Sequence, residues 1–476
     1  MDVHQNRRIA IIGGGLSGLA TATHLHLADP SLELTIFESS DRVGGVIYTE
    51  RVGEFLIDHG ADMFATQPPA ALRLCERLGV AGNLLMPKEQ GRGAKIVRRG
   101  RLVPIPDGFV LMRATQMWPM LNTPLLSPLG KLRWLAERFV SDDFGDRDVS
   151  VGEFVRKRMG DEVLQRLVAP LVAGIYTADV ERLSMQATMK NILAMQRQYG
   201  SLAKATSVRK RNGDDSVERQ SAGARYSQFR AFPGGMGDLI QTLADSLPEG
   251  TIRTQCTATA VTAGGQLSFH GSQAPETFDH VVVATPPRVS AKLLADVSPE
   301  AAAELSLIES ASTAIVVLVV RRSDITRPAN SFGFVVPHGE GRSILACSFA
   351  SEKFPDRAPQ DHVIIRVFIG GVIQSPLLQR DDDELQAIAI SELRELIGLQ
   401  SEPVLSRVVR WNNAMPQYQV GHVQRVEKIE REIEKNERIS LMSNALHGVG
   451  IAPVIASAER LANQITQRAA SSRDCS

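Results

Sequence analysis

The hydrophobic and polar positions at the start of the chain predict a strand, a helix and a second strand. Residues 8–12 (RIAII) form a short apolar run that ends in glycines. The stretch LSGLATATHLHLA after it has its apolar residues at helical spacing, and the run LELTIFE then has the composition of a strand. We expect these three elements to form a βαβ unit.

The pattern farther along predicts a second sheet and a helical insertion. Residues 94–106 predict a hairpin that bends at Arg99-Gly100, and strand-like runs follow at 315–321, 331–336, 343–349 and 362–370. Residues 251–263 also have the pattern of one strand. Residues 108–206 are rich in Leu, Met, Trp and Pro and then mostly helical in spacing, whereas 207–224 lack an apolar period and predict a solvated loop. The last strand, glycine turn and helix of the chain repeat the order of elements in the first βαβ unit. We therefore expect the C-terminal segment to pack in the same domain as that unit.

Length and charge narrow the class of protein. The 476 residues exceed the roughly 250–300 at which one core stops growing, so two or three packed units are expected. Fifty-three basic and fifty-three acidic residues cancel, which argues against a nucleic-acid partner. The four cysteines have no CxxC spacing and no partnered histidines, so neither a metal site nor a disulfide framework is predicted. With no signal-peptide pattern and no spanning apolar run, we expect a cytoplasmic protein, with peripheral contact at the inner face of the membrane left open.

The first glycine turn predicts a dinucleotide site. Gly13, Gly15 and Gly18 form GxGxxG between the first strand and the first helix. Glycines at this spacing allow a tight turn and close approach of a pyrophosphate, and the helix N-terminus offers free N–H groups and a favourable dipole. Glu38 ends the second strand about twenty residues later, where its carboxylate can accept hydrogen bonds from a ribose. Strand, turn, helix and acid together favour nucleotide binding over a purely structural turn.

Two further features favour FAD over NAD. Arg42, Gly44 and Gly45 follow Glu38 closely, and a guanidinium there can neutralise pyrophosphate while the glycines let the backbone cross near the cofactor. The stretch HGVGIAP (447–453) is a glycine turn that opens a helix, whose N-terminus could face the flavin, although an ordinary strand-to-helix turn would look the same. The chain has no GxSxG, HExxH or P-loop motif and no grouped histidines. We therefore predict no metal and no catalytic side chain, with the chemistry performed by the flavin.

Three further segments have distinctive sequences: Val151–Ser184 (with PLVAGIYTADVERLS), Phe232–Leu239 (FPGGMGDL) and Arg410–His422 (RWNNAMPQYQVGH). With these segments, nearly the whole chain resembles the oxygen-dependent porphyrinogen oxidases of haem synthesis, the protoporphyrinogen and coproporphyrinogen III oxidases within the flavin amine oxidase superfamily. The stretches GGGLSGLA and ESSDRVGG are shared with amine oxidases and carotenoid desaturases, whereas the three segments distinguish the porphyrinogen oxidases. The resemblance implies FAD-dependent removal of six hydrogens from a porphyrinogen by O2, with release of H2O2.

The resemblance also implies an architecture of the α/β class. It has a Rossmann-type, p-hydroxybenzoate hydroxylase-like FAD-binding domain, a mixed-sheet substrate domain and an α-helical insertion. We expect residues 1–90, 225–300 and 425–476 in the FAD domain, 91–107 and 301–424 in the substrate domain, 108–206 in the insertion and 207–224 in a loop.

Site residues follow from the resemblance position by position. Arg92 and Lys95 are the first candidates for binding the substrate's propionates, since the aligned family arginine is replaced by Ala94, although a run of charges can also be a solvated face. Further departures from the family pattern lie at Ala61, Asn444 and Pro453. The residues implied to line FAD are Gly13, Gly14, Gly15, Leu16, Ser17, Gly18, Glu38, Ser39, Arg42, Gly44, Gly45, Gly60, Ala61, Asp62, Met63, Ala258, Val449, Gly450 and Ile451.

Several alternatives stay open on sequence alone. One is another flavin amine oxidase activity on an amine or a polyene, and another is a flavin- or porphyrin-binding protein without turnover. Residues 109–140, with Trp118 and Trp134, suit either an interfacial helix at a membrane or a wall of the substrate cavity. The choice between the two porphyrinogens, a homodimer, and hand-off of the product to a downstream haem-pathway enzyme are also undecided.

Overall fold

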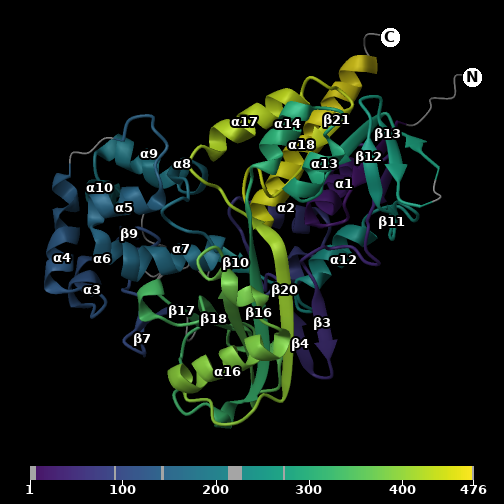
Figure 1. The fold of residues 1–476 in the computed structure, drawn as a ribbon. Coiled ribbons are helices and arrows are strands. Elements are labelled where there is room, and N and C mark those ends of the chain that lie inside the picture. Colours follow the sequence, from purple (N-terminus) through teal and green to yellow (C-terminus); the bar gives the residue numbers. More distant parts are fainter. Residues whose placement is uncertain (1–6, 90–92, 141–143, 213–227, 272–273, 474–476) are drawn as a thin grey trace, which may run out of the picture.

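The computed structural model describes residues 7–89, 93–140, 144–212, 228–271 and 274–473. Figure 1 shows three parts: a parallel sheet with its helices at upper right, a long sheet below it, and a group of helices at the left. Both ends of the described chain lie in the upper right part, so the last segment returns to the first. Among the residues described, no helix has the length and apolar run needed to cross a membrane.

The upper right part is built on a five-stranded sheet in which every neighbouring pair is parallel. Its two central strands, β1 (Arg8–Ile12) and β15 (His280–Val283), are short runs buried on both faces apart from the exposed Arg8, as expected where helices cover a parallel sheet. This confirms the predicted α/β class with a Rossmann-type unit. In spatial order the strands are β11 (Ile252–Arg253), β2 (Glu33–Phe37), β1 (Arg8–Ile12), β15 (His280–Val283) and β21 (Ile439–Leu441).

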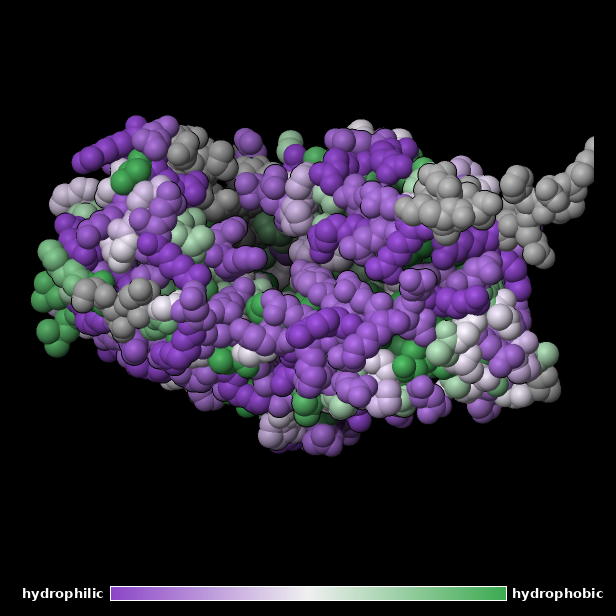
Figure 2. Space-filling view, turned by 90° about the horizontal axis from the view of Figure 1, so that it is seen from above, coloured by the Kyte–Doolittle hydropathy of each residue, from purple (hydrophilic) through white to green (hydrophobic). Residues whose placement is uncertain are grey.

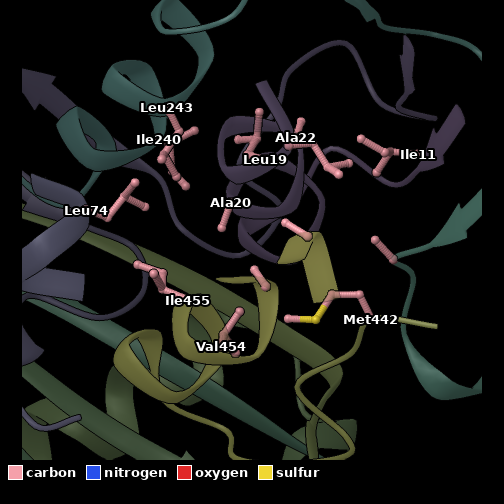
Figure 3. Packing of buried hydrophobic residues seen from close by; sticks show 14 of the residues in the cluster. Ile11, Leu19, Ala20, Ala22, Leu74, Ile240, Leu243, Met442, Val454 and Ile455 are labelled. Atoms are coloured by element: carbon pink, nitrogen blue, oxygen red, sulfur yellow. The ribbon is translucent and has the colours of Figure 1, made fainter. Parts of the chain in front are cut away.

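The first and last helices pack against each other on this sheet. Helix α1 (Leu16–Ala28) and helix α18 (Ile451–Arg473) meet through small residues such as Ala20, while α2 (Ala70–Arg77) and α12 (Gly237–Asp245) close the same core. Figure 3 shows Leu19, Ile240 and Ile455 from three of these helices converging on one apolar cluster. Four segments that are distant in sequence therefore form one core around the start of the chain.

The lower part is a seven-stranded mixed sheet. Only the pair β17–β6 is parallel, and the other neighbours are antiparallel. Along β16, residues such as Val316 and Leu318 face helix α16 (Asp382–Ile397), while Ile315 and Val317 pack toward Ile57. The strands in spatial order are β20 (Leu405–Pro416), β16 (Ser310–Arg321), β19 (His362–Gly370), β18 (Ala346–Phe349), β17 (Gly333–Val335), β6 (Lys95–Arg98) and β7 (Arg101–Pro104).

The helical part is a separate group of helices. It has its own core around Phe154, Leu164 and Val168, closed by the hairpin of β8 (Phe109–Val110) and β9 (Arg113–Ala114). Its main helices are α3 (Met117–Asn122), α4 (Pro128–Leu135), α5 (Val151–Met159), α7 (Ala169–Tyr176), α8 (Met185–Thr188), α9 (Lys190–Tyr199) and α10 (Leu202–Asn212).

Smaller elements join the parts. They are β3 (Thr49–Val52), β4 (Phe55–Asp58), β5 (Phe64–Ala65), β10 (Phe229–Arg230), β12 (Ala258–Val261), β13 (Gln266–Phe269), β14 (Glu276–Thr277), α13 (Pro287–Leu293), α14 (Pro299–Ser306), α15 (Ala350–Lys353) and α17 (His422–Ile433).

Three expectations are corrected by this arrangement. The single strand expected at 251–263 is two strands in different sheets, because Gln255 adopts a φ of 54° and the chain turns between them. Helix α10 extends to Asn212, so residues 207–212 are helical, and 213–224 of the expected loop lie outside the described residues. The boundary expected at residue 300 falls inside α14, which packs on α13 and α17.

Candidate functional site

The loop between β1 and α1 requires glycine at two positions. Gly13 has a φ of 107°, and its backbone N–H donates to the carbonyl of Phe37 at 2.8 Å. A Cβ added at Gly18 would lie 1.9 Å from the Gly13 carbonyl oxygen, closer than any side chain allows. Gly18 therefore keeps the helix against the loop, as the motif predicts.

Gly15 has a different role, because a Cβ there would meet no atom within 4 Å. Gly15 forms a parallel bridge with Gly44, whose N–H donates to the Gly14 carbonyl at 2.8 Å. Gly45 is exposed beside them. The two glycine turns thus make one bare backbone surface at the N-terminus of α1, where no side chain caps the helix. A surface of this kind accepts phosphate groups.

Glu38 is fixed at the end of β2 beside this surface. Its Oε2 accepts a hydrogen bond from the Gly14 N–H at 2.7 Å, and its Oε1 accepts from the backbone and the hydroxyl of Ser40 at 2.8 Å each. The hydroxyl of Ser39 also donates to Oε1, at 3.3 Å. The carboxylate is therefore held where the sequence motif expects a ribose, with its position set by backbone N–H groups on two sides.

Arg42 is exposed but is bound to its own turn. Its Nη2 donates to the Gly45 carbonyl at 2.9 Å, and its guanidinium lies 4.6 Å from the ring centre of Tyr48. Tyr48 and Val46 are themselves 39% and 45% exposed next to the glycine surface. This edge offers apolar groups and one cation, a combination that suits a flavin and its pyrophosphate.

The turn Gly60–Met63 packs directly behind this edge. A Cβ at Gly60 would lie 2.6 Å from the Val46 carbonyl oxygen and 2.8 Å from the ring of Trp411, so the turn touches both. Asp62 in this turn is buried, and its Oδ2 lies 2.7 Å from Lys353 Nζ and 3.2 Å from Arg366 Nη1. Burial acts to raise the pKa of Asp62, but Lys353 and Arg366 more than offset it and hold that pKa well below its usual range. The Asp62 carboxylate is thus bound inside by these two cations and is not available to a cofactor.

The turn before α18 is held by two aromatic side chains. Gly448 has a φ of 141°, and its N–H donates to the Tyr418 hydroxyl at 2.7 Å; Tyr418 in turn donates to the Asn444 carbonyl at 2.5 Å. The ring of His422 stacks on Tyr418 with centroids 4.0 Å apart, and its Nε2 lies 3.3 Å from the Leu446 carbonyl oxygen. Burial lowers the pKa of His422 to about 4, so the ring is neutral and Nε2 donates. Val449, Gly450 and Ile451 follow directly on this fixed turn.

Two of the three segments in which the sequence resembles porphyrinogen oxidases, Val151–Ser184 and Arg410–His422, are in contact in the structure. Within Arg410–His422, the carbonyl of Tyr418 accepts from the Ser184 N–H at 2.8 Å, and Gln419 bridges to Leu183 of Val151–Ser184. The Gly421 N–H donates to Asp148 at 2.9 Å. The segment therefore ties the helical part to the turn before α18. Figure 2 shows a hollow between the helical part at the left and the parallel-sheet part at the right.

The remaining expected residues are less informative. Ala258 begins β12, two residues after Cys256, whose N–H donates to the Glu38 carbonyl at 2.8 Å. Lys95 is half-buried in β6, opposite Phe334 and Pro104, and Arg92 lies outside the described residues. Lys353 and Arg366 were missed by sequence reasoning, because nothing in their local patterns marks them, whereas Tyr418 lies in the distinguishing segment Arg410–His422 but was given no role of its own.

The chain is similar in sequence and in structure to known flavin-dependent proteins. The chain matches the family of flavin containing amine oxidoreductases over residues 16–466. Coproporphyrinogen III oxidase of Propionibacterium freudenreichii subsp. freudenreichii is 32% identical over 97% of this chain and 91% of its own length. Protoporphyrinogen oxidase 2, chloroplastic/mitochondrial, of Arabidopsis thaliana is 26% identical over 91% of this chain and 89% of its length. A crystal structure named for a protoporphyrinogen oxidase of Exiguobacterium sp. 255-15 has a TM-score of 0.85 at 28% identity, covering 98% of this chain and 99% of that one.

These matches confirm both the family resemblance and the flavin cofactor predicted from the sequence, and the bare glycine surface, the uncapped helix and Glu38 fit FAD. FAD is the cofactor of this chain, and the protein is an oxidoreductase. A family match that spans most of the sequence shows that the chain belongs to the flavin-containing amine oxidoreductases.

Proposed function

We propose that the protein oxidises a porphyrinogen of haem synthesis, with coproporphyrinogen III as its substrate and protoporphyrinogen IX as the alternative. The observation that carries this proposal is the junction of Val151–Ser184 with Arg410–His422, the two segments in which the sequence resembles porphyrinogen oxidases in particular. The relative with 32% identity bears the coproporphyrinogen name, and the protoporphyrinogen oxidase of Arabidopsis thaliana is more distant, at 26%.

The role proposed for the chain's own residues is to bind and orient FAD and to shield it from water. Bound FAD supplies the redox chemistry: three two-electron oxidations remove six hydrogens, and three O2 are reduced to three H2O2. The glycine surface and Glu38 would hold the nucleotide end of FAD, and the turns at Gly60–Met63 and Val449–Ile451 would support its ring. The sequence has no dedicated acid or base motif, which fits hydride removal by the flavin. O2 as the electron acceptor is part of the proposal.

The test is aerobic fluorescence of the purified yellow protein with each porphyrinogen in turn, because the oxidised macrocycle fluoresces and the reduced one does not. We expect a faster rise with coproporphyrinogen III than with protoporphyrinogen IX, and one H2O2 for each two electrons removed. Faster oxidation of protoporphyrinogen IX would reverse the substrate assignment. A rate no greater than autoxidation with both would refute the function, and no H2O2 despite turnover would refute O2 as acceptor.

Peripheral membrane contact is a second part of the proposal, and an exposed apolar patch supports it. Trp118 on α3, Leu129 and Leu132 on α4, and Phe139 just after α4 are between 62% and 81% exposed. Apolar residues gather at the left edge of Figure 2, on the side of the molecule where Figure 1 has α3 and α4. Arg138 lies beside Phe139, with its guanidinium 5.9 Å from the ring centre. Exposed aromatic and aliphatic groups next to a cation suit an anionic lipid surface.

Vesicle sedimentation tests this contact. The protein should sediment with vesicles that contain phosphatidylglycerol, and the double variant Trp118→Ser/Phe139→Ser should sediment at least tenfold less. Val404→Ser, which removes a 53% exposed side chain on another part of the surface, is the matched control and should behave as wild type. Equal sedimentation of all three proteins would contradict the proposal.

A further inference from the structure

Five charged side chains are buried together where the parallel-sheet part meets the seven-stranded sheet. Asp58 and Asp62 come from the end of β4 and the turn after it, and Lys353, Arg357 and Arg366 come from the segment between α15 and β19. Each of these side chains is at most 8% exposed. Charged groups are rarely buried to this degree unless they are paired.

Three cations share only two carboxylates. Arg357 lies 3.5 Å from Asp58, whereas Lys353 and Arg366 both contact Asp62. Asp58 also accepts hydrogen bonds from the Thr49 hydroxyl and the Met236 N–H, which hold it in place. The five side chains thus carry one net positive charge.

The guanidinium groups are also incompletely satisfied. Arg357 Nε and Nη1 and Arg366 Nε are buried without a hydrogen-bond partner among the described residues. Their groups lie over the rings of Phe354 and Phe368 at 5.5 and 5.4 Å, a contact that offsets part of the lost hydration. A buried surplus charge of this kind is unfavourable by itself and stabilises any negative charge that comes near it.

A short series of contacts connects this cluster to the FAD surface. Arg366 Nη2 donates to the Gly60 carbonyl, and Gly60 packs on the Val46 carbonyl. Val46 directly follows Gly44 and Gly45, and Gly44 bridges to Gly15 at the N-terminus of α1. The positive cluster therefore lies directly behind the turn that supports the FAD edge, in a region with little water to screen it.

We propose that this cluster sets the redox potential of the bound flavin: its net positive charge favours reduced FAD, which carries more negative charge than oxidised FAD, and so raises the midpoint potential. Lys353 and Arg366 act through the field of the cluster, as positioning and electrostatic residues that need not touch the substrate. The inference rests on FAD binding at the glycine surface and is independent of which porphyrinogen is oxidised.

The test changes the charge of the cluster in both directions. Asp62→Asn adds one positive charge and should raise the midpoint potential, whereas Lys353→Met removes one and should lower it. We expect each change to shift the equilibrium between oxidised and reduced FAD about tenfold, or about 30 mV for a two-electron couple. The double variant Asp62→Asn/Lys353→Met restores the net charge and should return the potential close to wild type. The potentials are measured by dye-coupled reduction without substrate, so a failure of the proposed function would not affect them.

The opposite signs separate an electrostatic role from a structural one, since damage to the fold would move both single variants the same way. Lys353→Arg keeps the charge and should leave the potential unchanged, as should Lys428→Met, which removes an exposed partner of Glu304. Arg357→Met offers a second way to remove the surplus charge and should act like Lys353→Met. Shifts of the same sign in Asp62→Asn and Lys353→Met, or no shift in any of these variants, would overturn the proposal.

Discussion

The Tyr418 hydroxyl accepts a hydrogen bond from the backbone N–H of Gly448 at 2.7 Å, thirty residues away in the chain. The same hydroxyl donates to the Asn444 carbonyl, so one side chain closes the turn that leads into α18. Burial raises the pKa of Tyr418, so the hydroxyl stays protonated and able to donate at any physiological pH.

Tyr418→Phe should reduce the free energy of unfolding by about 1–3 kcal/mol, because the Gly448 N–H and the Asn444 carbonyl lose their partner while the ring stacking on His422 is kept. FAD should also dissociate faster, since Val449–Ile451 follow on this turn. Denaturant unfolding and flavin release are the measurements. Tyr199→Phe, in a half-buried position on α9, serves as the control, and equal effects of both variants would contradict this role.

Gly15→Ala should impair FAD binding, whereas Gly18→Ala should impair the stability of the fold. A Cβ at Gly15 meets no protein atom within 4 Å, so the variant should fold with nearly normal stability but lose FAD, because the methyl group occupies the approach of the pyrophosphate. A Cβ at Gly18 would lie 1.9 Å from a carbonyl oxygen, so that variant should be poorly stable even as apoprotein. Yellow colour and the thermal midpoint of each apoprotein distinguish the two effects. A Gly15→Ala protein that retains FAD fully would refute the phosphate role of this loop.

Glu38→Ala should weaken FAD binding by about 1–3 kcal/mol, as expected for loss of a charged hydrogen-bond acceptor. Part of this effect is indirect, because Glu38 also fixes the Gly14 N–H and Ser40. Glu38→Gln retains an acceptor and should lose less. Titration of each apoprotein with FAD measures both affinities, and wild-type affinity in Glu38→Ala would exclude this residue from the site.

Stability should fall in mild acid because three histidines are buried as neutral rings. Burial lowers the pKa of His24, His280 and His422 to about 4 each, below the value near 6.5 expected in the unfolded chain. Between about pH 6.5 and 4 the unfolded chain binds more protons, so the stabilisation is complete above pH 6.5 and is lost as the pH falls through this window.

The expected loss between pH 7 and pH 5 is on the order of 1–2 kcal/mol for each histidine. Unfolding by urea at the two pH values measures it. His422→Gln should reduce the pH dependence, whereas substitution of the exposed His338 by Gln should leave it unchanged. A pH dependence that is the same in His422→Gln as in wild type would show that this ring does not contribute.

Local rules were enough to predict the βαβ unit and the glycine turn that carry the candidate nucleotide site. The glycine spacing, the helix after it and Glu38 lie within one βαβ unit, where steric limits on a tight turn and the apolar period act over a few residues. The hairpin at Arg99-Gly100 is as local, and both of these residues have positive φ in the structure. The prediction was wrong where a contact with a residue far away in the sequence overrides the local pattern. The strand expected at 251–263 breaks at Gln255, whose N–H donates to the Ser40 carbonyl.

The sequence by itself therefore determined the α/β class, the FAD loop and the family, because these follow from short-range geometry and from motifs of fixed spacing. Only the tertiary structure decided which charges meet. Asp62 and Lys353 are 291 residues apart, and their contact depends on how the seven-stranded sheet docks against the parallel one. Whether a carboxylate faces a cofactor or a buried lysine is set by that packing, since burial and the sum of neighbouring charges depend on every element around it.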